Sequence, residues 1–257
     1  MHLLLVKTSS LGDVIHNLPV ASDLRRAFHE ATIDWCVEES FSAIPRLHPG
    51  VGRVLPVAVR RWRKHLFDGG TWSEMGALRR SLRERDYDAV LDTQGLVKSA
   101  LIASQAIGPK LGYDAASARE PMAARFYDRH ASVSRQLHAV VRNRELAAKA
   151  LGYTLSGDPD YGIAAPAARF DWLPSRPSLV FLTATSRDDK LWPEDHWVAL
   201  GEKLAAEGFL AVLPAGNPVE RQRAARLAKA IPGAIAAPAM KLPELASLLA
   251  GARGVVG

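Results

Sequence analysis

The alternation of short apolar runs with longer helically periodic segments is the feature that most constrains the fold of this chain. Residues 2–6 (HisLeuLeuLeuVal) are followed by residues 13–28, where apolar side chains recur at helical spacing. Such alternation is typical of a parallel sheet with helices on both faces. The same order then returns along the chain: we expect strands at 31–37, 51–57, 88–92, 179–182 and 209–213, and helices at 40–47, 73–85, 96–106, 194–207, 218–230 and 243–250.

The alternation lapses between residues 156 and 177, where a Gly- and Asp-rich stretch precedes three prolines. This break predicts two Rossmann-like domains, residues 1–160 and 178–257, joined by a linker at 161–177. The last residues, AlaArgGlyValValGly, resemble the start of a further buried strand. We therefore expect the second domain to be incomplete at Gly257.

Composition bounds the class of protein. A chain of 257 residues with 48% hydrophobic residues and a mean hydropathy of -0.04 is long and apolar enough to fold around a real core. No stretch approaches the roughly 18 apolar residues of a membrane span, and the opening run lacks the basic segment and cleavage site of a secretory signal. These features favour a cytoplasmic protein.

A single cysteine and a basic charge balance add two expectations. Cys36 has no partner for an intrachain disulfide and is expected to be a buried small hydrophobe. The net charge of +6 and the isoelectric point of 9.6 favour acidic partners. Nucleic acid, phosphorylated lipid and an anionic membrane surface all fit this balance.

The first strand-to-helix turn, residues 7–13, carries polar groups where ligands of open α/β sheets bind, beyond the carboxyl ends of strands. Ser9 and Ser10 offer hydroxyls and backbone N–H groups to an anion or a sugar. The glycine pattern is not that of a dinucleotide-binding turn. Asp13 is either a helix-capping carboxylate or a catalytic base, and spacing alone favours the cap. His16 is interpreted as a helix-surface histidine.

A basic cluster surrounds Trp62. Arg60, Arg61, Arg63 and Lys64 place four cations within five residues, and arginine forks suit bidentate phosphate binding. A merely solvated charge run is an equally good interpretation. No helix-turn-helix, zinc-finger or RNA-binding spacing accompanies the cluster, so nucleic acid is not expected as a partner.

Two further cations lie in turns. Lys98 follows AspThrGlnGlyLeuVal at the start of a predicted helix, where a lysine opposes the helix dipole and therefore indicates an anionic ligand. Asp92 and Thr93 are plausible structural caps in the same turn. Arg119 lies in a loop, where either an ordinary salt bridge or a ligand contact is possible.

The second half repeats this logic. Thr185, Ser186 and Lys190 follow an apolar strand and precede a helix, a position suited to a diphosphate. The adjacent Asp188 and Asp189 are interpreted as loop or cap residues rather than metal ligands.

Two residues further along fit a nucleoside. Glu220 is placed to accept hydrogen bonds from a ribose, although a glutamate at an exposed helix start is ordinary. Met240 either packs on an adenine face or fills core.

Five motifs, taken in order, carry a resemblance. They are LysThrSerSerLeuGlyAspValIleHisAsnLeuPro, ValArgArgTrpArgLys, AspThrGlnGlyLeuValLysSer, AlaArgGluPro and ThrSerArgAspAspLysLeuTrpPro. Together they span nearly the whole chain, which resembles the ADP-heptose:lipopolysaccharide heptosyltransferases, in particular those that add the first heptose. The resemblance implies a GT-B fold, with two Rossmann-like domains facing across a cleft. The family continues into an AspThrGly…His loop that closes on the donor, whereas this sequence ends at Gly257.

The resemblance also implies a function and a set of roles. We therefore expect an inverting transferase that moves L-glycero-D-manno-heptose from ADP-heptose to the Kdo of Kdo-lipid A, without a metal or another cofactor. We expect it to act as a peripheral protein at the cytoplasmic face of the inner membrane, against an anionic surface. The resemblance gives Asp13 the role of general base. The other implied contacts are to the acceptor, by Ser9, Ser10, Arg60, Arg61, Arg63, Lys64, Lys98 and Arg119, and to the donor, by Thr185, Ser186, Lys190, Glu220 and Met240.

Two other functions are compatible with the residues. The chain resembles, less well, a second heptosyltransferase that acts one sugar further out, because the basic cluster suits a phosphate-rich inner acceptor better. A non-catalytic, basic anion-binding module is the alternative from another class, and it would be marked by steep salt dependence without sugar preference.

Overall fold

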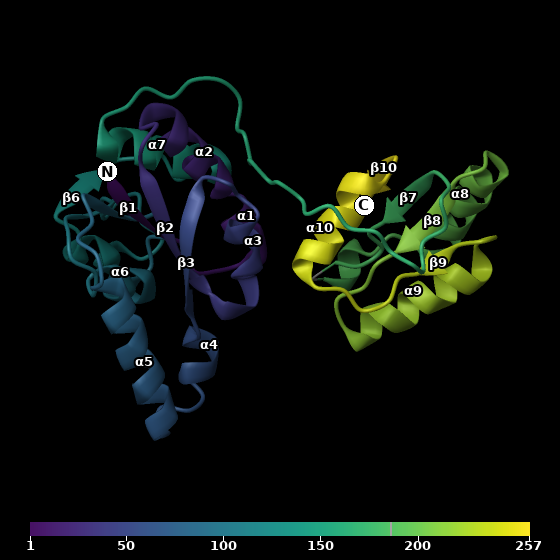
Figure 1. Cartoon of the computed structure of the whole chain (residues 1–257), viewed down its shortest axis with the longest axis horizontal. Helices are drawn as coiled ribbons and strands as arrows, with labels where there is room; N and C mark the ends of the chain where they lie inside the picture. Colours follow the sequence, from purple (N-terminus) through teal and green to yellow (C-terminus); the bar gives the residue numbers. More distant parts are fainter. Residues whose placement is uncertain (186) are drawn as a thin grey trace. The chain divides into compact units, whose positions relative to one another are not determined.

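The computed structural model describes residues 1–185 and 187–257 (Figure 1). The chain divides into two compact units, Met1–Ala164 and Ala165–Gly257. No helix in the described part of the chain is long and apolar enough to cross a membrane.

Unit 1 is built on a six-stranded sheet in which every pair of neighbouring strands is parallel, in the order β3-β2-β1-β4-β5-β6. Leu5 pairs with Trp35 on one side and with Leu91 on the other. The expected parallel α/β architecture is therefore confirmed in this unit. Its strands are β1 (His2–Val6), β2 (Thr32–Glu38), β3 (Val51–Val57), β4 (Ala89–Asp92), β5 (Lys110–Tyr113) and β6 (Arg129–Ala131).

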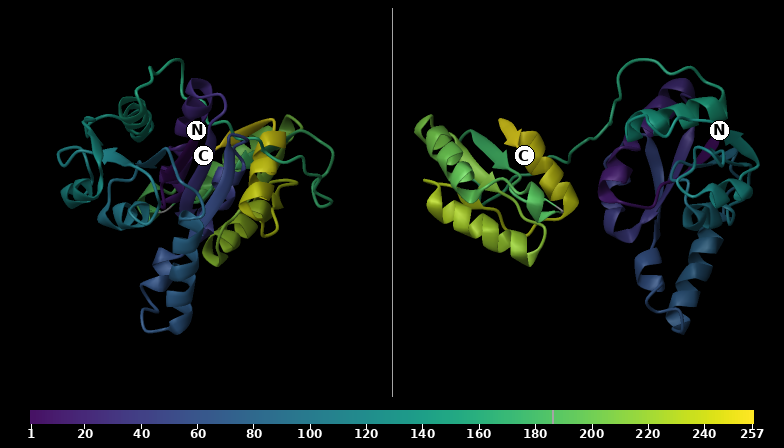
Figure 2. Two further views of the ribbon diagram at one scale, coloured as in Figure 1. Left: turned by 60° about the vertical axis from the view of Figure 1, so that its left-hand side comes forward. Right: turned by 180° about the vertical axis from the view of Figure 1, so that it is seen from behind.

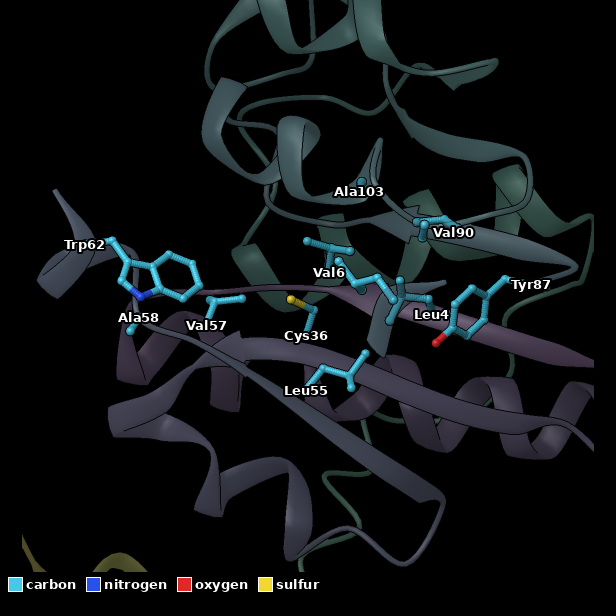
Figure 3. Packing of buried hydrophobic residues seen from close by; sticks show 12 residues of the cluster. Leu4, Val6, Cys36, Leu55, Val57, Ala58, Trp62, Tyr87, Val90 and Ala103 are labelled. Atoms are coloured by element: carbon cyan, nitrogen blue, oxygen red, sulfur yellow. The ribbon is translucent and has the colours of Figure 1, made fainter. Parts of the chain in front are cut away.

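Helices cover both faces of this sheet. On one face α2 packs against α7 (Figures 1 and 2); on the other, α5 and α6 close a core that includes Leu4, Val6 and Cys36 (Figure 3). Because side chains alternate along a strand, Leu3 and Leu5 are buried on the first face. The helices are α1 (Leu11–Ile15), α2 (Leu18–Ala27), α3 (Ala43–Arg46), α4 (Val59–Trp62), α5 (Gly69–Leu82), α6 (Val97–Ala103) and α7 (Ala139–Leu151), with 3-10 turns η1 (Glu39–Phe41) and η2 (Pro121–Phe126).

Cys36 is fully buried, as expected, and burial strongly raises the pKa of its thiol. It lies on β2 among aliphatic side chains (Figure 3). This cysteine is a packing residue, because a thiol with a raised pKa is a poor nucleophile at neutral pH.

Unit 2 contains a four-stranded parallel sheet in the order β10-β7-β8-β9. Phe181 and Trp197 pack at 5.1 Å between ring centroids in its core. The terminal residues form a strand, as the sequence predicts. The elements are β7 (Ser178–Phe181), η3 (Asp188–Lys190), α8 (Glu194–Ala206), β8 (Leu210–Leu213), α9 (Pro218–Ala230), β9 (Ile235–Ala236), α10 (Leu242–Gly251) and β10 (Gly254–Val256).

Residues 152–177, all of them described, contain neither helix nor strand. The stretch divides between the units, because Ala164 donates its N–H to Leu47 of unit 1, whereas Phe170, Trp172 and Leu173 pack on the core of unit 2. The apolar residues near its end thus belong to the second fold.

The prediction of one continuous helix over residues 13–28 is wrong. The structure has two helices there, α1 and α2, with Asn17 between them. Pro19 occupies the first turn of α2, where its missing N–H is tolerated, but inside a continuous helix it would remove a hydrogen bond. The break places Asp13 on a short helix at the sheet edge.

Candidate active site

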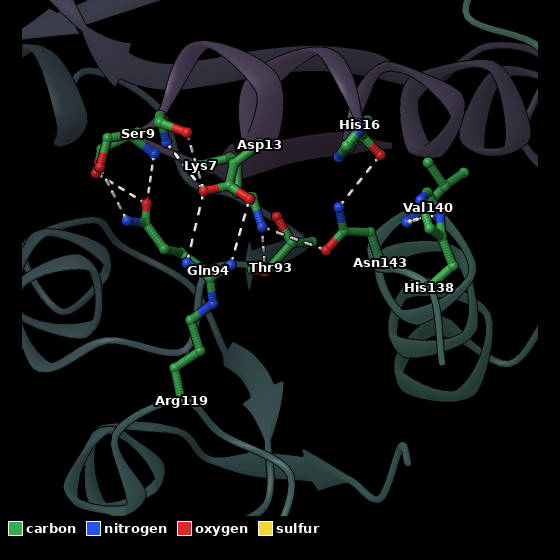
Figure 4. A network of polar contacts seen from close by, with 12 residues as sticks. Lys7, Ser9, Asp13, His16, Thr93, Gln94, Arg119, His138, Val140 and Asn143 are labelled. Carbon is green, nitrogen blue, oxygen red and sulfur yellow. Dashed lines mark hydrogen bonds and ion pairs between the residues drawn. The ribbon is translucent and has the colours of Figure 1, made fainter. Parts of the chain in front are cut away.

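The carboxyl ends of β1 and β4 define the candidate site of unit 1. These two strands are neighbours, and the chain runs outward from them in both directions, to β2 and β3 on one side and to β5 and β6 on the other. Such a reversal of strand order opens a crevice at the carboxyl edge of a parallel sheet. The turns at residues 7–13 and 92–98 meet there, as Figure 4 shows.

Asp13 lies where these two turns meet. Its carboxylate accepts hydrogen bonds from the backbone N–H of Ser10 at 3.1 Å and from the Ser10 hydroxyl at 3.3 Å, so it does cap α1. It also forms an ion pair with Arg119 at 3.3 Å, which joins residues that lie 106 positions apart (Figure 4). Capping therefore leaves the carboxylate accessible, with 18% of its side chain exposed.

The surroundings of Asp13 keep it ionised. Partial burial raises the pKa of this carboxyl, but the Ser10 N–H, the charges of Lys7 and Arg119 and the Ser10 hydroxyl together lower it more, and the net pKa is below its ordinary value. At neutral pH the group is a carboxylate able to accept a proton.

Lys7 is buried at the end of β1, directly behind the carboxylate. Its ammonium donates to the carbonyl of Thr93 at 2.9 Å and to Oδ1 of Asn143 at 3.3 Å (Figure 4). Burial lowers the pKa of Lys7 to about 8, although the charge of Asp13 favours the protonated form. The lysine thus provides a fixed positive charge beneath the site.

The hydroxyl of Ser9 links the two turns. It accepts from Nε2 of Gln94 at 3.3 Å and from Nζ of Lys98 at 3.2 Å. Gln94 in turn accepts from the N–H of Thr8 at 2.6 Å and from its hydroxyl at 2.8 Å. Ser9, Lys98 and Asp13 are thereby held at one edge of the sheet.

Asp92 has a structural role below these contacts. It is fully buried, and it accepts from the N–H groups of Gln94 and Gly95 and from the Tyr127 hydroxyl at 2.8 Å. Burial raises the pKa of Asp92. Asp92 is thus a structural residue of the turn, but it does not cap α6, whose N-cap residue is Leu96.

The basic cluster after β3 is only partly available to a ligand. Arg61 is engaged by the carboxylates of Glu39 and Glu74, at 3.1 and 2.9 Å, so its charge is already paired within the chain. Arg60 places its guanidinium over the ring of Phe41, 5.2 Å from the centroid. Three exposed cations of the cluster, Arg60, Arg63 and Lys64, pair with no acid in the described part of the chain, and Arg60 alone of these lies over an aromatic ring.

His16 is half-buried at the end of α1. Its ring lies 5.4 Å from that of His138, and its carbonyl accepts from Nδ2 of Asn143 at 3.2 Å. The described contacts do not pair it with Asp13, which fits a histidine of structural role.

In unit 2 the corresponding reversal of strand order lies between β7 and β10. Thr185 and Lys190 follow β7 and are exposed, and Lys190 ends the short turn η3. Asp189 of the same turn pairs with Arg187. Ser186 lies outside the described residues.

Glu220 and Met240 follow β8 and β9. Glu220 caps the start of α9, because its carboxylate accepts from the N–H of Gly216 at 2.7 Å and from the side chain of Asn217 at 2.6 Å. Met240 is half-buried and packs on the core cluster of Val180 and Leu248. Glu220 thus has the structural role of a residue at a helix start, and Met240 that of a core residue, each of which the sequence analysis gave as one of two interpretations. Among the described residues, no group of three or more His, Cys, Asp or Glu is arranged to hold a metal ion.

Comparisons with known proteins identify the family. The model of glycosyltransferase family 9 (heptosyltransferase) matches residues 75–257. The chain belongs to this heptosyltransferase family. Lipopolysaccharide heptosyltransferase 1 of Escherichia coli (strain K12) is 47% identical to it, over 100% of this chain and 81% of the relative.

Solved structures of the family agree in fold. The E. coli heptosyltransferase WaaC with ADP is 46% identical, has a TM-score of 0.92 and is matched over 99% of this chain and 80% of its own. The same enzyme with ADP-2-deoxy-2-fluoro heptose gives a TM-score of 0.91, over 99% and 82%. This heptosyltransferase therefore has the GT-B-type fold of its relatives, with two Rossmann-like domains.

Some site residues of this heptosyltransferase were missed by sequence reasoning. Asn143 lies within α7, and only the packing of α7 beside the end of β1 brings its amide to Lys7 and His16. A buried asparagine in the helical stretch AlaValValArgAsnArg was the one available signal. The burial of Lys7 could have been suspected, since it directly follows four buried apolar residues of β1.

Proposed function

We propose that this chain transfers L-glycero-D-manno-heptose from ADP-heptose to the Kdo of Kdo-lipid A, the first heptose addition of the lipopolysaccharide inner core. The observation that carries the proposal is the accessible Asp13 carboxylate at the carboxyl ends of β1 and β4, under the charges of Lys7 and Arg119 and with Lys98 bonded to Ser9 of the same turn. A base flanked by cations suits a hydroxyl nucleophile on an anionic sugar.

Asp13 is the general base in this proposal. As the anomeric carbon gains oxocarbenium character and the ADP leaves, the carboxylate takes the proton from the attacking Kdo hydroxyl. Attack from the face opposite the leaving group inverts the anomeric configuration. The cap from Ser10 and the ion pair with Arg119 hold the carboxylate in place for this step.

The cations of unit 1 bind the acceptor. Arg119, which pairs with Asp13, and Lys98, which donates to Ser9, face the Kdo carboxylates, with Ser9 and Ser10 as hydroxyl partners. Further along the same sheet edge, Arg63 and Lys64 reach the phosphates of lipid A. Arg60, whose guanidinium lies over the ring of Phe41, adds a third positive charge to this contact. Arg61 acts mainly by bracing, through Glu39 and Glu74.

The donor binds to unit 2 in the same proposal. Lys190 and the hydroxyls of Thr185 and Ser186 hold the diphosphate and stabilise the charge that develops as ADP leaves. Glu220 retains lone pairs for the ribose hydroxyls while it caps α9. Met240 offers its remaining exposed edge to the adenine.

The proposed place of action is the cytoplasmic face of the inner membrane, where the chain is peripheral and rests on an anionic surface. The lipid acceptor and the exposed cations Arg63 and Lys64 support this placement.

The variant Asp13→Asn tests the assignment. It keeps the size and the acceptor oxygen of the side chain but removes the base, so turnover is expected to fall about 10²-fold or more. Binding of deacylated Kdo-lipid A should stay within about threefold of the unchanged chain, because the cations remain. ADP release would be followed for turnover and a fluorescence titration for binding.

A matched control is Asp88→Asn. This aspartate lies at the opposite edge of the same sheet, where it accepts the N–H of His2 at 2.7 Å, and its replacement changes the net charge equally. It should leave turnover unchanged. Equal turnover in Asp13→Asn and Asp88→Asn would reject Asp13 as the base.

A further inference from the structure

A helical hairpin projects from the carboxyl edge of the first sheet. It begins directly after β3 and consists of α4, the loop 63–68 and α5 (Figures 1 and 2). We call residues 59–82 the α4–α5 hairpin. It rises from the same edge of the sheet that carries Asp13.

The hairpin is braced rather than loose. Glu74 of α5 accepts two hydrogen bonds from the guanidinium of Arg61, both at 2.9 Å, and one from the indole N–H of Trp62 at 2.7 Å. At the tip, the indole N–H of Trp72 donates to the carbonyl of Leu66 at 2.9 Å. These contacts fix the loop against α5, so its exposed side chains are presented on a firm support.

The tip of the hairpin is apolar. Phe67 is fully exposed, and Trp72 and Leu66 are 60% and 49% exposed. A cavity of about 520 Å³ is lined by Leu66 and Trp72 and continues along the hairpin toward α6, where its apolar lining includes Met75 and Leu101. Contiguous apolar surface with a polar rim marks a site of interaction.

The hairpin is also strongly basic. Residues 59–82 contain six cations and two acids. Both acids are occupied, since Glu74 binds Arg61 and Asp68 caps α5 through the N–H of Gly70 at 2.9 Å. At the rim of the cavity lie Arg63, Arg79 and Lys98, of which Lys98 also contacts Ser9 in the crevice of Asp13.

We propose that the tip of the α4–α5 hairpin docks on an anionic phospholipid bilayer. Leu66 and Phe67 enter the boundary between headgroups and acyl chains, Trp72 lies at headgroup level, and the flanking cations face lipid phosphates. A bilayer fits this surface because it offers negative charge and apolar depth together along one plane. The inference rests on the proposed function only in that the acceptor of that function lies in such a bilayer.

The test is sedimentation of the full chain with vesicles of phosphatidylglycerol and phosphatidylcholine, compared with vesicles of phosphatidylcholine alone. We expect binding to the anionic vesicles that weakens as salt rises. Phe67→Ser should lower the partition coefficient about tenfold, the loss expected when one buried phenyl group is removed. Val219→Ser, which alters an apolar side chain of unit 2 that is 75% exposed, should change nothing.

A second measurement reports the position of the hairpin tip through the fluorescence of Trp72. Vesicles with brominated acyl chains should quench the tryptophan fluorescence of the bound protein, and Trp72→Phe should remove most of that quenching. The other five tryptophans then act as an internal control. Binding without quenching, or quenching that persists in Trp72→Phe, would overturn the proposed docking face.

Titration with soluble, deacylated Kdo-lipid A separates this proposal from the proposed function. Phe67→Ser should bind it as the unchanged chain does, and a loss of this binding would make the tip part of the acceptor site instead. If no deacylated acceptor binds while vesicle binding still depends on Phe67, the proposed function fails and the docking surface stands. If Phe67→Ser sediments like the unchanged chain, the docking proposal is wrong.

Discussion

At the scale of single residues, Lys7 is the group whose behaviour should depend most visibly on pH. Burial lowers its pKa to about 8, whereas an unfolded lysine titrates near 10.5. Between these values the unfolded chain binds the additional proton, so the free energy of unfolding should rise with pH relative to a chain without this lysine. Compared with Lys7→Met, we expect a relative gain of roughly 3 kcal/mol as the pH rises from below 8 to 10.5.

Urea unfolding of both proteins across this pH range measures the difference. Lys149→Met is the matched control, because Lys149 is an exposed lysine of α7 that pairs with Glu145 on the same helix. Its difference from the unchanged chain should stay flat over the same range. A flat difference for Lys7→Met as well would mean that the Lys7 ammonium is not desolvated.

At the scale of elements, the packing of β5 against Tyr127, the residue after η2, holds Asp92 in place beneath the turn 92–98. Gly112 of β5 faces the ring of Tyr127, and a Cβ added there would lie 2.3 Å from that ring. Gly112→Ala should therefore displace Tyr127 from Asp92 and lower the free energy of unfolding by about 1–3 kcal/mol. Chemical denaturation measures this change. Gly69→Ala, where an added Cβ meets no atom within 4 Å, should be close to neutral, and equal losses in both variants would contradict the packing argument.

At the scale of the whole molecule, all residues of the proposed acceptor site lie in unit 1. The six-stranded sheet, its two helical layers and Lys7, Asp13 and Arg119 all lie within Met1–Ala164. A fragment of residues 1–164 should unfold cooperatively in a thermal scan and bind deacylated Kdo-lipid A within about threefold of the full chain.

A fragment of residues 1–137 lacks α7, and with it Arg144, the buried partner of Asp23 at 2.7 Å. It should not fold, and a folded shorter fragment would show that α7 is dispensable.

Much of the fold followed from the order of residues. Apolar periodicity located the strands and helices around residues 2–28, 51–57 and 178–230 because these segments are long or fully buried, and the local pattern then carries the signal. The short strands β5 and β6 and the helix α7 went unpredicted. β5 and β6 have four and three residues, too few for a period to show, and their pairing depends on neighbours distant in sequence.

What the sequence by itself determined was the parallel α/β class, the two-unit organisation, the position of Asp13 at a strand end and the membership of its motifs in a heptosyltransferase pattern. Only the tertiary structure decided which of two roles each polar residue takes. Asp13 both caps α1 and meets Arg119, whereas Arg61 is engaged by Glu74. The cap is a local contact that spacing predicts, but the pairing of Asp13 with Arg119 joins residues 106 positions apart. No local pattern encodes that pairing, because it forms only where packing of the sheet and helices brings the two side chains within hydrogen-bond distance.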